Sequence, residues 1–201
     1  MRTIPLAALA LAALALPALA QDAASPDPAK VQPGRYAVDG GHTQVGFKLS
    51  HMGFSNYSGT FSEVTGSLDL PQDRAQARLS VRFPTNSVST TSAKLTDELK
   101  APDWLDAAKH PEITFVSRKV EPTLPGKAKV TGDLTLHGVT RPVTLDVSFV
   151  GGGVNPMSKK ANIGFEATGT IRRSEFGVTK YLPLIGDELA LTIDAAFVRA
   201  D

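Results

Sequence analysis

The sequence has 201 residues, 42% of them hydrophobic, with no cysteine and a formal net charge of +1 at pH 7. This length suits one domain with a hydrophobic core, and the lack of cysteine excludes disulfides, thiolate metal ligands and thiol nucleophiles. A nearly balanced charge also excludes the clustered basic excess that recruits nucleic acids or anionic membrane surfaces, so we expect no nucleic-acid partner.

The first twenty residues have the pattern of a secretory signal peptide. Arg2 precedes an apolar run from Ile4 to Leu16, and Pro17 leads into Ala18-Leu19-Ala20. The run is shorter than the ~20 residues of a membrane-spanning helix, and small residues follow it at once. We predict cleavage after Ala20, a soluble mature chain without a transmembrane segment, and a periplasmic or secreted location. An uncleaved N-terminal anchor is the alternative.

The rest of the chain divides into a short lead-in and one domain. Residues 21–34 are rich in Ala, Pro and Asp and are expected to be disordered, whereas residues 35–201 form the domain. From Tyr36 onward apolar and polar residues alternate, which indicates strands with one buried face. The alternating segments are residues 45–49, 57–64, 67–70, 77–83, 113–120, 129–136, 143–149, 163–171 and 189–197. Turn residues separate them, including a run of three glycines at 151–153.

This spacing predicts an all-β fold of about eight strands. Such a meander is expected to close into an antiparallel barrel, because closure removes the exposed edges of an open sheet. Residues 92–110 interrupt the alternation: Leu95 and Leu99 are four positions apart, and Pro102 precedes Trp104. We expect one or two short helices there, over one mouth of the barrel.

Motifs for chemistry are few. The four histidines, His42, His51, His110 and His137, fall in predicted turns and strand ends with no paired helical spacing. We therefore interpret them as turn residues and expect no metal site and no cofactor. The sequence has no Gly-x-Ser-x-Gly elbow and no phosphate-binding glycine loop. We expect no catalytic residues and no enzyme activity, with a hidden acid/base pair of carboxylates as the alternative.

The interior of the barrel remains as the place for function. A barrel of about eight strands is either filled by side chains or wide enough for one small ligand. Aromatic residues make up only 6% of the sequence, and many positions on the apolar faces are Ala or Val. This composition favours an unfilled interior, although periodicity alone leaves both arrangements open.

One long run and four shorter pieces resemble the YceI family of exported lipid-binding proteins. The run is TGDLTLHGVTRPVTLDVSF, from Thr131 to Phe149. The shorter pieces are Tyr36–Asp39 with His42, residues 51–61, KHPEITF at 109–115 and RSEFG at 173–177. The similarity spans residues 35–197. One departure is Asp97-Glu98-Leu99, where members often carry a charged residue and a histidine before the leucine.

The resemblance implies a lipocalin-like barrel, often dimeric, whose apolar tunnel takes a polyisoprenoid chain. Together with the alternation it predicts a tunnel lined by Val45, Phe47, Leu49, Leu79, Val81, Phe115, Leu134, Leu136, Leu145, Val147, Phe165, Leu191 and Ile193. Leu95, Leu99 and Trp104 are expected near the mouth. The basic candidates for a lipid head group are Lys94, Arg172, Arg173 and Lys180, and a plain surface charge is the alternative for each.

We therefore expect a periplasmic carrier of an amphiphilic isoprenoid lipid, a prenyl quinone or prenyl phosphate, that forms a homodimer as many members do. Two alternatives stay open. An enzyme acting on such a lipid would need polar residues that converge inside the barrel. A filled barrel that serves as a protein-interaction module would have no internal pocket.

Overall fold

The computed structural model describes residues 23–200, so the expected signal peptide lies outside the described residues. The strands are β1 (Gly34–Val38), β2 (Gln44–His51), β3 (Ser55–Phe61), β4 (Thr65–Leu70), β5 (Arg78–Pro84), β6 (Ser89–Thr90), β7 (Glu112–Leu124), β8 (Lys127–Leu136), β9 (Val139–Val154), β10 (Ala161–Arg172) and β11 (Glu188–Arg199). The α-helix is α1 (Ala93–Leu99), and 3-10 turns lie at Pro28–Lys30, Arg74–Gln76, Thr85–Ser87 and Arg173–Phe176.

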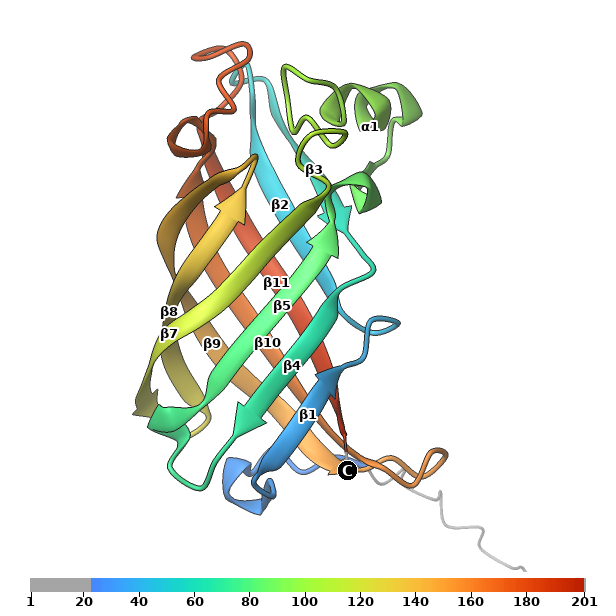
Figure 1. Ribbon diagram of the computed structural model, residues 1–201, viewed down its shortest axis with the longest axis vertical. Coiled ribbons are helices and arrows are strands. Elements are labelled where there is room, and N and C mark those ends of the chain that lie inside the picture. The colour runs from blue at the N-terminus through green and yellow to red at the C-terminus, as the bar shows by residue number, and fades with distance from the viewer. Residues whose placement is uncertain (1–22, 201) are drawn as a thin grey trace, which may run out of the picture.

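The strands form a closed antiparallel barrel (Figure 1). Strand β11 closes it, pairing with β10 along one edge and with both β1 and β2 along the other. Strands β1 and β2 therefore lie end to end along β11. Strands β4 and β3 lie end to end along β1 and β2, and strands β5 and β6 lie end to end along β4 and β3. Three of the eleven strands thus continue the line of another strand, so the barrel wall is eight strands around. The predicted eight-stranded barrel is confirmed.

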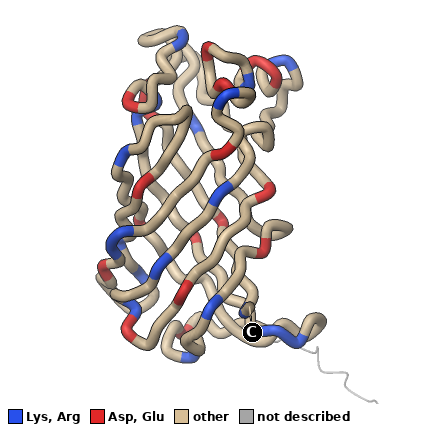
Figure 2. The backbone as a smooth tube through the Cα atoms, in the orientation of Figure 1, with Lys and Arg blue, Asp and Glu red and all other residues tan. Residues whose placement is uncertain are grey.

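Apolar side chains form two adjoining clusters inside this wall. The larger cluster draws on β2, β3, β5 and β7 to β11 and on the segments at one mouth. The smaller cluster lies around β1 and β4 at the other end and includes Tyr36, Leu68 and Phe197. Lys, Arg, Asp and Glu residues are scattered along the strands and at both ends of the barrel, without a large patch of positive or negative charge (Figure 2). Within residues 23–200, Arg173 is the only charged residue that is buried.

Large side chains lie against glycines on the inner wall. A Cβ atom at Gly59 would come within 2.4 Å of the Phe47 ring, and one at Gly132 within 2.5 Å of the Phe115 ring. At Gly169 the nearest atom would be Leu145 Cδ2, at 2.7 Å. Because a glycine leaves space at the wall, each neighbouring large side chain can lie along the wall instead of projecting across the barrel.

The lead-in expected to be disordered is ordered where the structure describes it, which corrects that prediction. Ser25 pairs with Gly152 through two backbone hydrogen bonds, and Val31 is buried in the smaller core cluster. The glycines that we expected to form a turn lie inside β9. They allow this close approach, since a Cβ at Gly153 would lie 2.3 Å from the Ala23 carbonyl oxygen.

The helical prediction over residues 92–110 is confirmed in part. Helix α1 lies over the upper mouth in Figure 1, and the Ser92 hydroxyl accepts a hydrogen bond from the Leu95 amide at its first turn. The second segment, after Pro102, forms turns and no helix. None of the helices between residues 23 and 200 has the length and apolar character that a membrane span requires.

The packing of Gly132 gives a stability prediction. We expect Gly132→Ala to lower the free energy of unfolding by about 1 to 3 kcal/mol, because the new methyl group would overlap both the Phe115 ring and a backbone carbonyl. Chemical denaturation followed by circular dichroism measures the change. The control is Gly164→Ala, whose Cβ would have no neighbour nearer than the Val150 Cβ, at 3.8 Å. Equal stability of the two variants would contradict the close packing.

Candidate functional site

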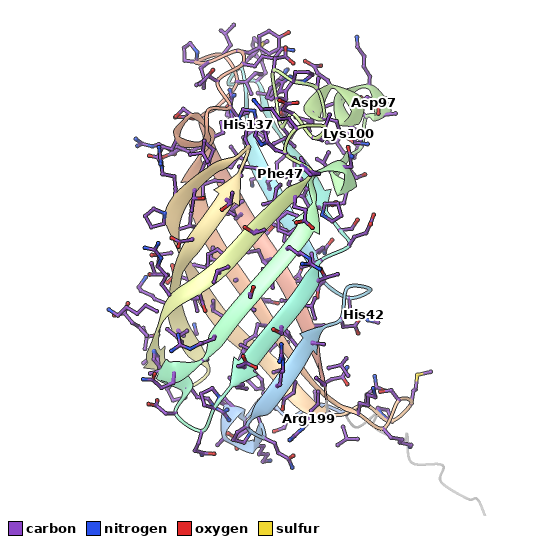
Figure 3. The ribbon with its side chains drawn as sticks, in the orientation of Figure 1. His42, Phe47, Asp97, Lys100, His137 and Arg199 are labelled. Carbon is purple, nitrogen blue, oxygen red and sulfur yellow. The ribbon has the colours of Figure 1, made fainter. Side chains whose placement is uncertain are left out.

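The structure brings the predicted lining residues together inside the barrel. All thirteen except Phe165 belong to the larger core cluster or pack against it, and Phe165 packs against the smaller cluster. Figure 3 shows Phe47 within the barrel below the covered mouth. Leu95, Leu99 and Trp104 join the larger cluster from the mouth, as expected. The contact of these residues with a ligand stays a prediction.

The inward face of β11 indicates that this interior is not completely filled. Its outward side chains Ala190 and Thr192 are exposed, and both of its edges are paired. Leu189, Leu191 and Ile193 point to the opposite face, yet they are only partly buried. The same intermediate burial occurs at five other predicted lining residues, Val45, Leu79, Val81, Val147 and Phe165. A side chain inside a closed and tightly packed barrel would be fully buried, so accessible space remains beside these residues.

Two segments cover the upper mouth (Figure 1). One consists of α1 and the turns up to residue 110, with Trp104 only 4% exposed. The other is the connection between β10 and β11, residues 173–187, which buries Phe176, Val178 and Ile185 in the larger core cluster. Sequence reasoning missed this second cover. Its signal was the loss of alternation after β10, with Gly177 in a left-handed turn at φ 80°.

Arg173 holds the second cover in place. Its guanidinium donates hydrogen bonds to the carbonyl oxygens of Gly186, Val178 and Ile185, at 2.8 to 2.9 Å, and lies 5.4 Å from the centre of the Trp104 ring. Burial lowers the pKa of Arg173, and the nearby Tyr57 acts against this shift. The arrangement makes Arg173 a structural anchor whose guanidinium is already engaged by backbone.

A polar cluster joins the two covers across Trp104. The Glu98 carboxylate accepts a hydrogen bond from the Trp104 indole at 3.2 Å and lies 3.4 Å from the Lys180 ammonium. Asp103 lies 2.5 Å from the same ammonium, and this hydrogen bond raises the pKa of Lys180 and lowers that of Asp103. Glu98 belongs to the segment that departs from the family pattern, and it carries this contact between the covers.

The four basic head-group candidates do not form one site. Lys180 and Arg173 both lie near the Trp104 ring, with the Lys180 ammonium 5.7 Å from its centre. Lys94 is exposed on α1, and Arg172 is exposed beside Glu188 on the outside of the barrel. Tyr57 faces the same region, and burial raises the pKa of its hydroxyl, which keeps it protonated.

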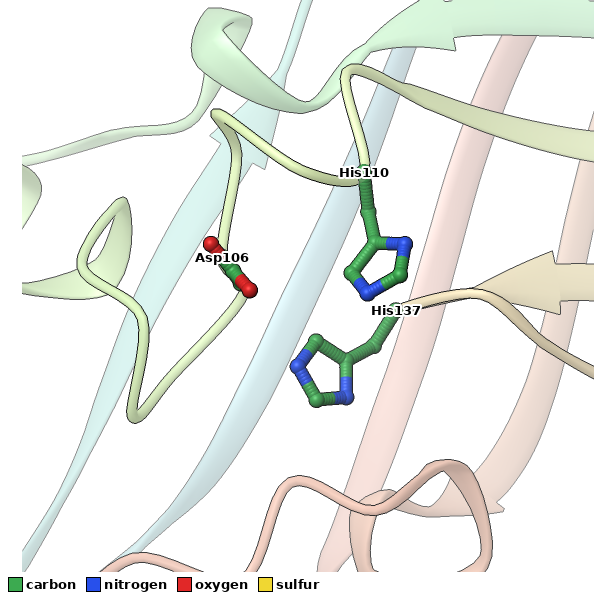
Figure 4. A group of neighbouring side chains, drawn as sticks. All are labelled: Asp106, His110 and His137. Carbon is green, nitrogen blue, oxygen red and sulfur yellow. The ribbon is translucent and has the colours of Figure 1, made fainter.

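Three side chains near the mouth converge as metal ligands could. Asp106, His110 and His137 each offer one ligand atom, and these atoms lie within 4.8 Å of one another (Figure 4). The rings of His110 and His137 stand edge to face with centres 4.9 Å apart. Sequence reasoning, which treated each histidine as an isolated turn residue, missed this cluster. Residues 110 and 137 are far apart in sequence, so only the fold shows that they meet.

The role of Arg173 can be tested against its neighbour. We expect Arg173→Leu to lower the free energy of unfolding by about 2 to 4 kcal/mol, because it leaves buried carbonyl oxygens without a donor. Arg172→Leu is the control and should change stability by less than about 0.5 kcal/mol, since that side chain is exposed. Urea denaturation measures both. A stable Arg173→Leu protein would show that the second cover does not need this anchor.

Comparison with known proteins places the chain in a family. It is 36% identical to a UPF0312 protein of Ectopseudomonas mendocina over 167 residues, covering 82% of this chain and 87% of that one. A UPF0312 protein of Pseudomonas putida is 39% identical over 146 residues, 71% of this chain and 76% of the relative.

Solved structures agree with this placement. BcnA of Burkholderia cenocepacia has a TM-score of 0.71 at 25% identity, covering 79% of this chain and 98% of that one. The Campylobacter jejuni YceI protein gives 0.65 at 29% identity, over 76% and 90%. A polyisoprenoid binding domain from Saccharophagus degradans shares the fold, with a TM-score of 0.60 at 13% identity over 84% and 99%. Residues 36–197 match the YceI-like domain, and the chain belongs to the YceI-like family.

Proposed function

We propose that this protein is a carrier of an amphiphilic isoprenoid lipid, a prenyl quinone or prenyl phosphate, whose tail lies inside the barrel. The observation that carries the proposal is the closed apolar interior with partly buried inward side chains, such as Leu191, Ile193 and Val81. The fold that this chain shares with a polyisoprenoid binding domain supports it. The signal-peptide pattern at the N-terminus supports a periplasmic location, where such a lipid needs a carrier.

The tail alone can supply the affinity. An isoprenoid chain is nearly insoluble in water, and a lining of Val, Leu and Phe replaces its hydration. At about 0.8 kcal/mol for each buried methylene, twenty carbons contribute roughly 16 kcal/mol before the several kcal/mol that association costs. The head group then contributes selectivity more than strength.

The barrel limits the length of chain that it can enclose. Strand β11, which carries Leu191 and Ile193 on its inward face, has 12 residues. A strand of that length spans ~40 Å, or ~30 Å along the axis of a barrel whose strands tilt by about 40°. A longer prenyl chain must fold back or leave through a mouth.

The mouth under Trp104 suits the polar end of such a lipid. The protonated Tyr57 hydroxyl can donate a hydrogen bond to a quinone carbonyl or a phosphate oxygen. The Lys180 ammonium adds positive charge there, although Glu98 and Asp103 already offset much of it. Lys94 and Arg172 lie on exposed outer surfaces and are the weaker head-group candidates.

Native mass spectrometry of the protein purified from its own host tests the proposal directly. We expect a bound mass that organic extraction resolves into a molecule built of isoprene units. A protein that carries nothing and takes up neither added prenyl quinone nor added prenyl phosphate would contradict the proposal and favour a filled barrel. The same spectra report whether the protein is a dimer.

Substitution of one inward residue tests the location of the tail. We expect Leu191→Trp to weaken binding of long prenyl chains at least tenfold while short chains are less affected, because the indole occupies part of the interior. The matched control is Ala190→Trp, on the adjacent outward position of the same strand. Fluorescence titration with prenyl alcohols of increasing length measures both. Equal chain-length profiles would exclude this stretch of β11 from the binding site.

A further inference from the structure

We propose that Asp106, His110 and His137 form a binding site for a divalent transition metal ion, with Zn²⁺ as the best match. Two imidazole nitrogens and one carboxylate oxygen are a donor set that Zn²⁺ accepts, with a fourth position left for water. The proposal does not depend on the lipid. It assigns a function to side chains that neither the barrel wall nor the Trp104 cluster uses.

The distances are within reach of a bound ion. Ligand atoms around tetrahedral Zn²⁺ lie ~3.3 Å apart when each is about 2.0 Å from the metal. The three candidate atoms lie within 4.8 Å of one another and belong to half-buried side chains. Closing this difference needs small side-chain rotations and leaves the strands in place.

The hydrogen bond of His137 gives its ring the orientation that a ligand needs. Its Nδ1 lies 3.1 Å from the Phe176 carbonyl oxygen. A carbonyl oxygen can only accept, so Nδ1 carries the proton and Nε2 presents its lone pair. In Figure 4 the other nitrogen of this ring points to the side on which Asp106 lies. Metal-bound histidines in proteins usually have such a second partner, often a backbone carbonyl.

The local backbone holds the other two ligands in place. Asp106 has a left-handed φ of 44°, and its carbonyl oxygen accepts a hydrogen bond from the His110 amide at 2.8 Å. The Thr85 hydroxyl donates to the His110 carbonyl oxygen at 2.6 Å. Gly138, at φ 73°, lies directly against the imidazole, because a Cβ there would come within 2.5 Å of His110 Cε1. The fold therefore packs the His110 ring closely beside His137.

The candidate ligand atoms are not engaged elsewhere. In the part of the chain that the structure describes, the Asp106 carboxylate and the His110 imidazole have no hydrogen-bond or ion-pair partner. By contrast, Glu98 and Asp103 contact Lys180, and Asp187 accepts two hydrogen bonds from Ser174. Half-buried polar atoms without partners are the ones that a metal ion would satisfy.

A bound ion would join three parts of the upper mouth. Asp106 and His110 belong to the first cover, and His137 belongs to the turn between β8 and β9. The hydrogen bond from His137 to Phe176 extends the connection to the second cover. The ion would thus tie both covers to the barrel rim.

Calorimetric titration tests the site. The protein is purified without a histidine tag, treated with EDTA, dialysed and titrated with ZnCl₂. We expect one Zn²⁺ per chain, with affinity reduced at least tenfold by Asp106→Asn and by His137→Gln. Asparagine also tolerates the left-handed backbone, so Asp106→Asn removes the charge without new strain. The control is His42→Gln, because His42 is exposed, bonds to Asp39 and lies on the side of the barrel away from His137 (Figure 3).

Several outcomes would overturn the proposal. These are a wild-type protein that takes up no Zn²⁺, uptake that Asp106→Asn and His137→Gln leave unchanged, or a loss as large in His42→Gln. Because His137→Gln also removes a contact to Phe176, circular dichroism checks its fold, and His110→Gln replaces it if it is unfolded. Visible absorption of the Co²⁺-loaded protein provides a second readout, since the intense bands of a four-coordinate site should disappear in Asp106→Asn.

Discussion

The pairing of β11 with strands on both of its edges is the constraint on which the rest of the structure depends. It joins the last strand of the sheet to the first, so each of the eight strand positions in the wall is paired on both sides along at least part of its length. A closed wall of hydrogen bonds is stable without a partner sheet packed across it. The interior can therefore stay partly unfilled at Leu191 and Ile193, which an open sandwich could not tolerate. Glycines such as Gly59 and Gly132 also keep the interior partly unfilled, because they let aromatic rings lie along the wall.

The alternation of apolar and polar residues was sufficient to predict the closed barrel and which side chains point into it, because period two sets which face each side chain occupies. It was not sufficient for residues whose positions depend on distant contacts. Residues 23–31 appear unstructured from composition, but the glycines of β9 make a surface on which they dock. The second cover is held by one buried guanidinium. The loss of alternation after β10 marks where the strand ends but does not show that the next segment lies over the mouth.

The resemblance to the YceI family implies an apolar tunnel, and four basic residues are candidates for binding a lipid head group. The structure separates those residues by their environment. Arg172 and Arg173 are adjacent in sequence, yet one is exposed beside Glu188 and the other donates to three carbonyl oxygens. The two residues have the same side chain and neighbouring positions, and only the turn after β10 decides which one is buried. A residue's role at this mouth therefore follows from its backbone surroundings more than from its type.

The two sides of the mouth differ in how their polar groups are satisfied. Around Trp104, the Lys180 ammonium pairs with Glu98 and Asp103 of the opposite cover and Arg173 lies over the indole ring, which joins the covers without any ligand. Around His137, a carboxylate and an imidazole meet without bonding to one another or to other described residues. These side chains are only half-buried, so their polar atoms remain open to solvent and to a ligand. The unpaired side of the mouth is therefore where a small polar ligand or ion has the most to contribute, beside an interior suited to an apolar one.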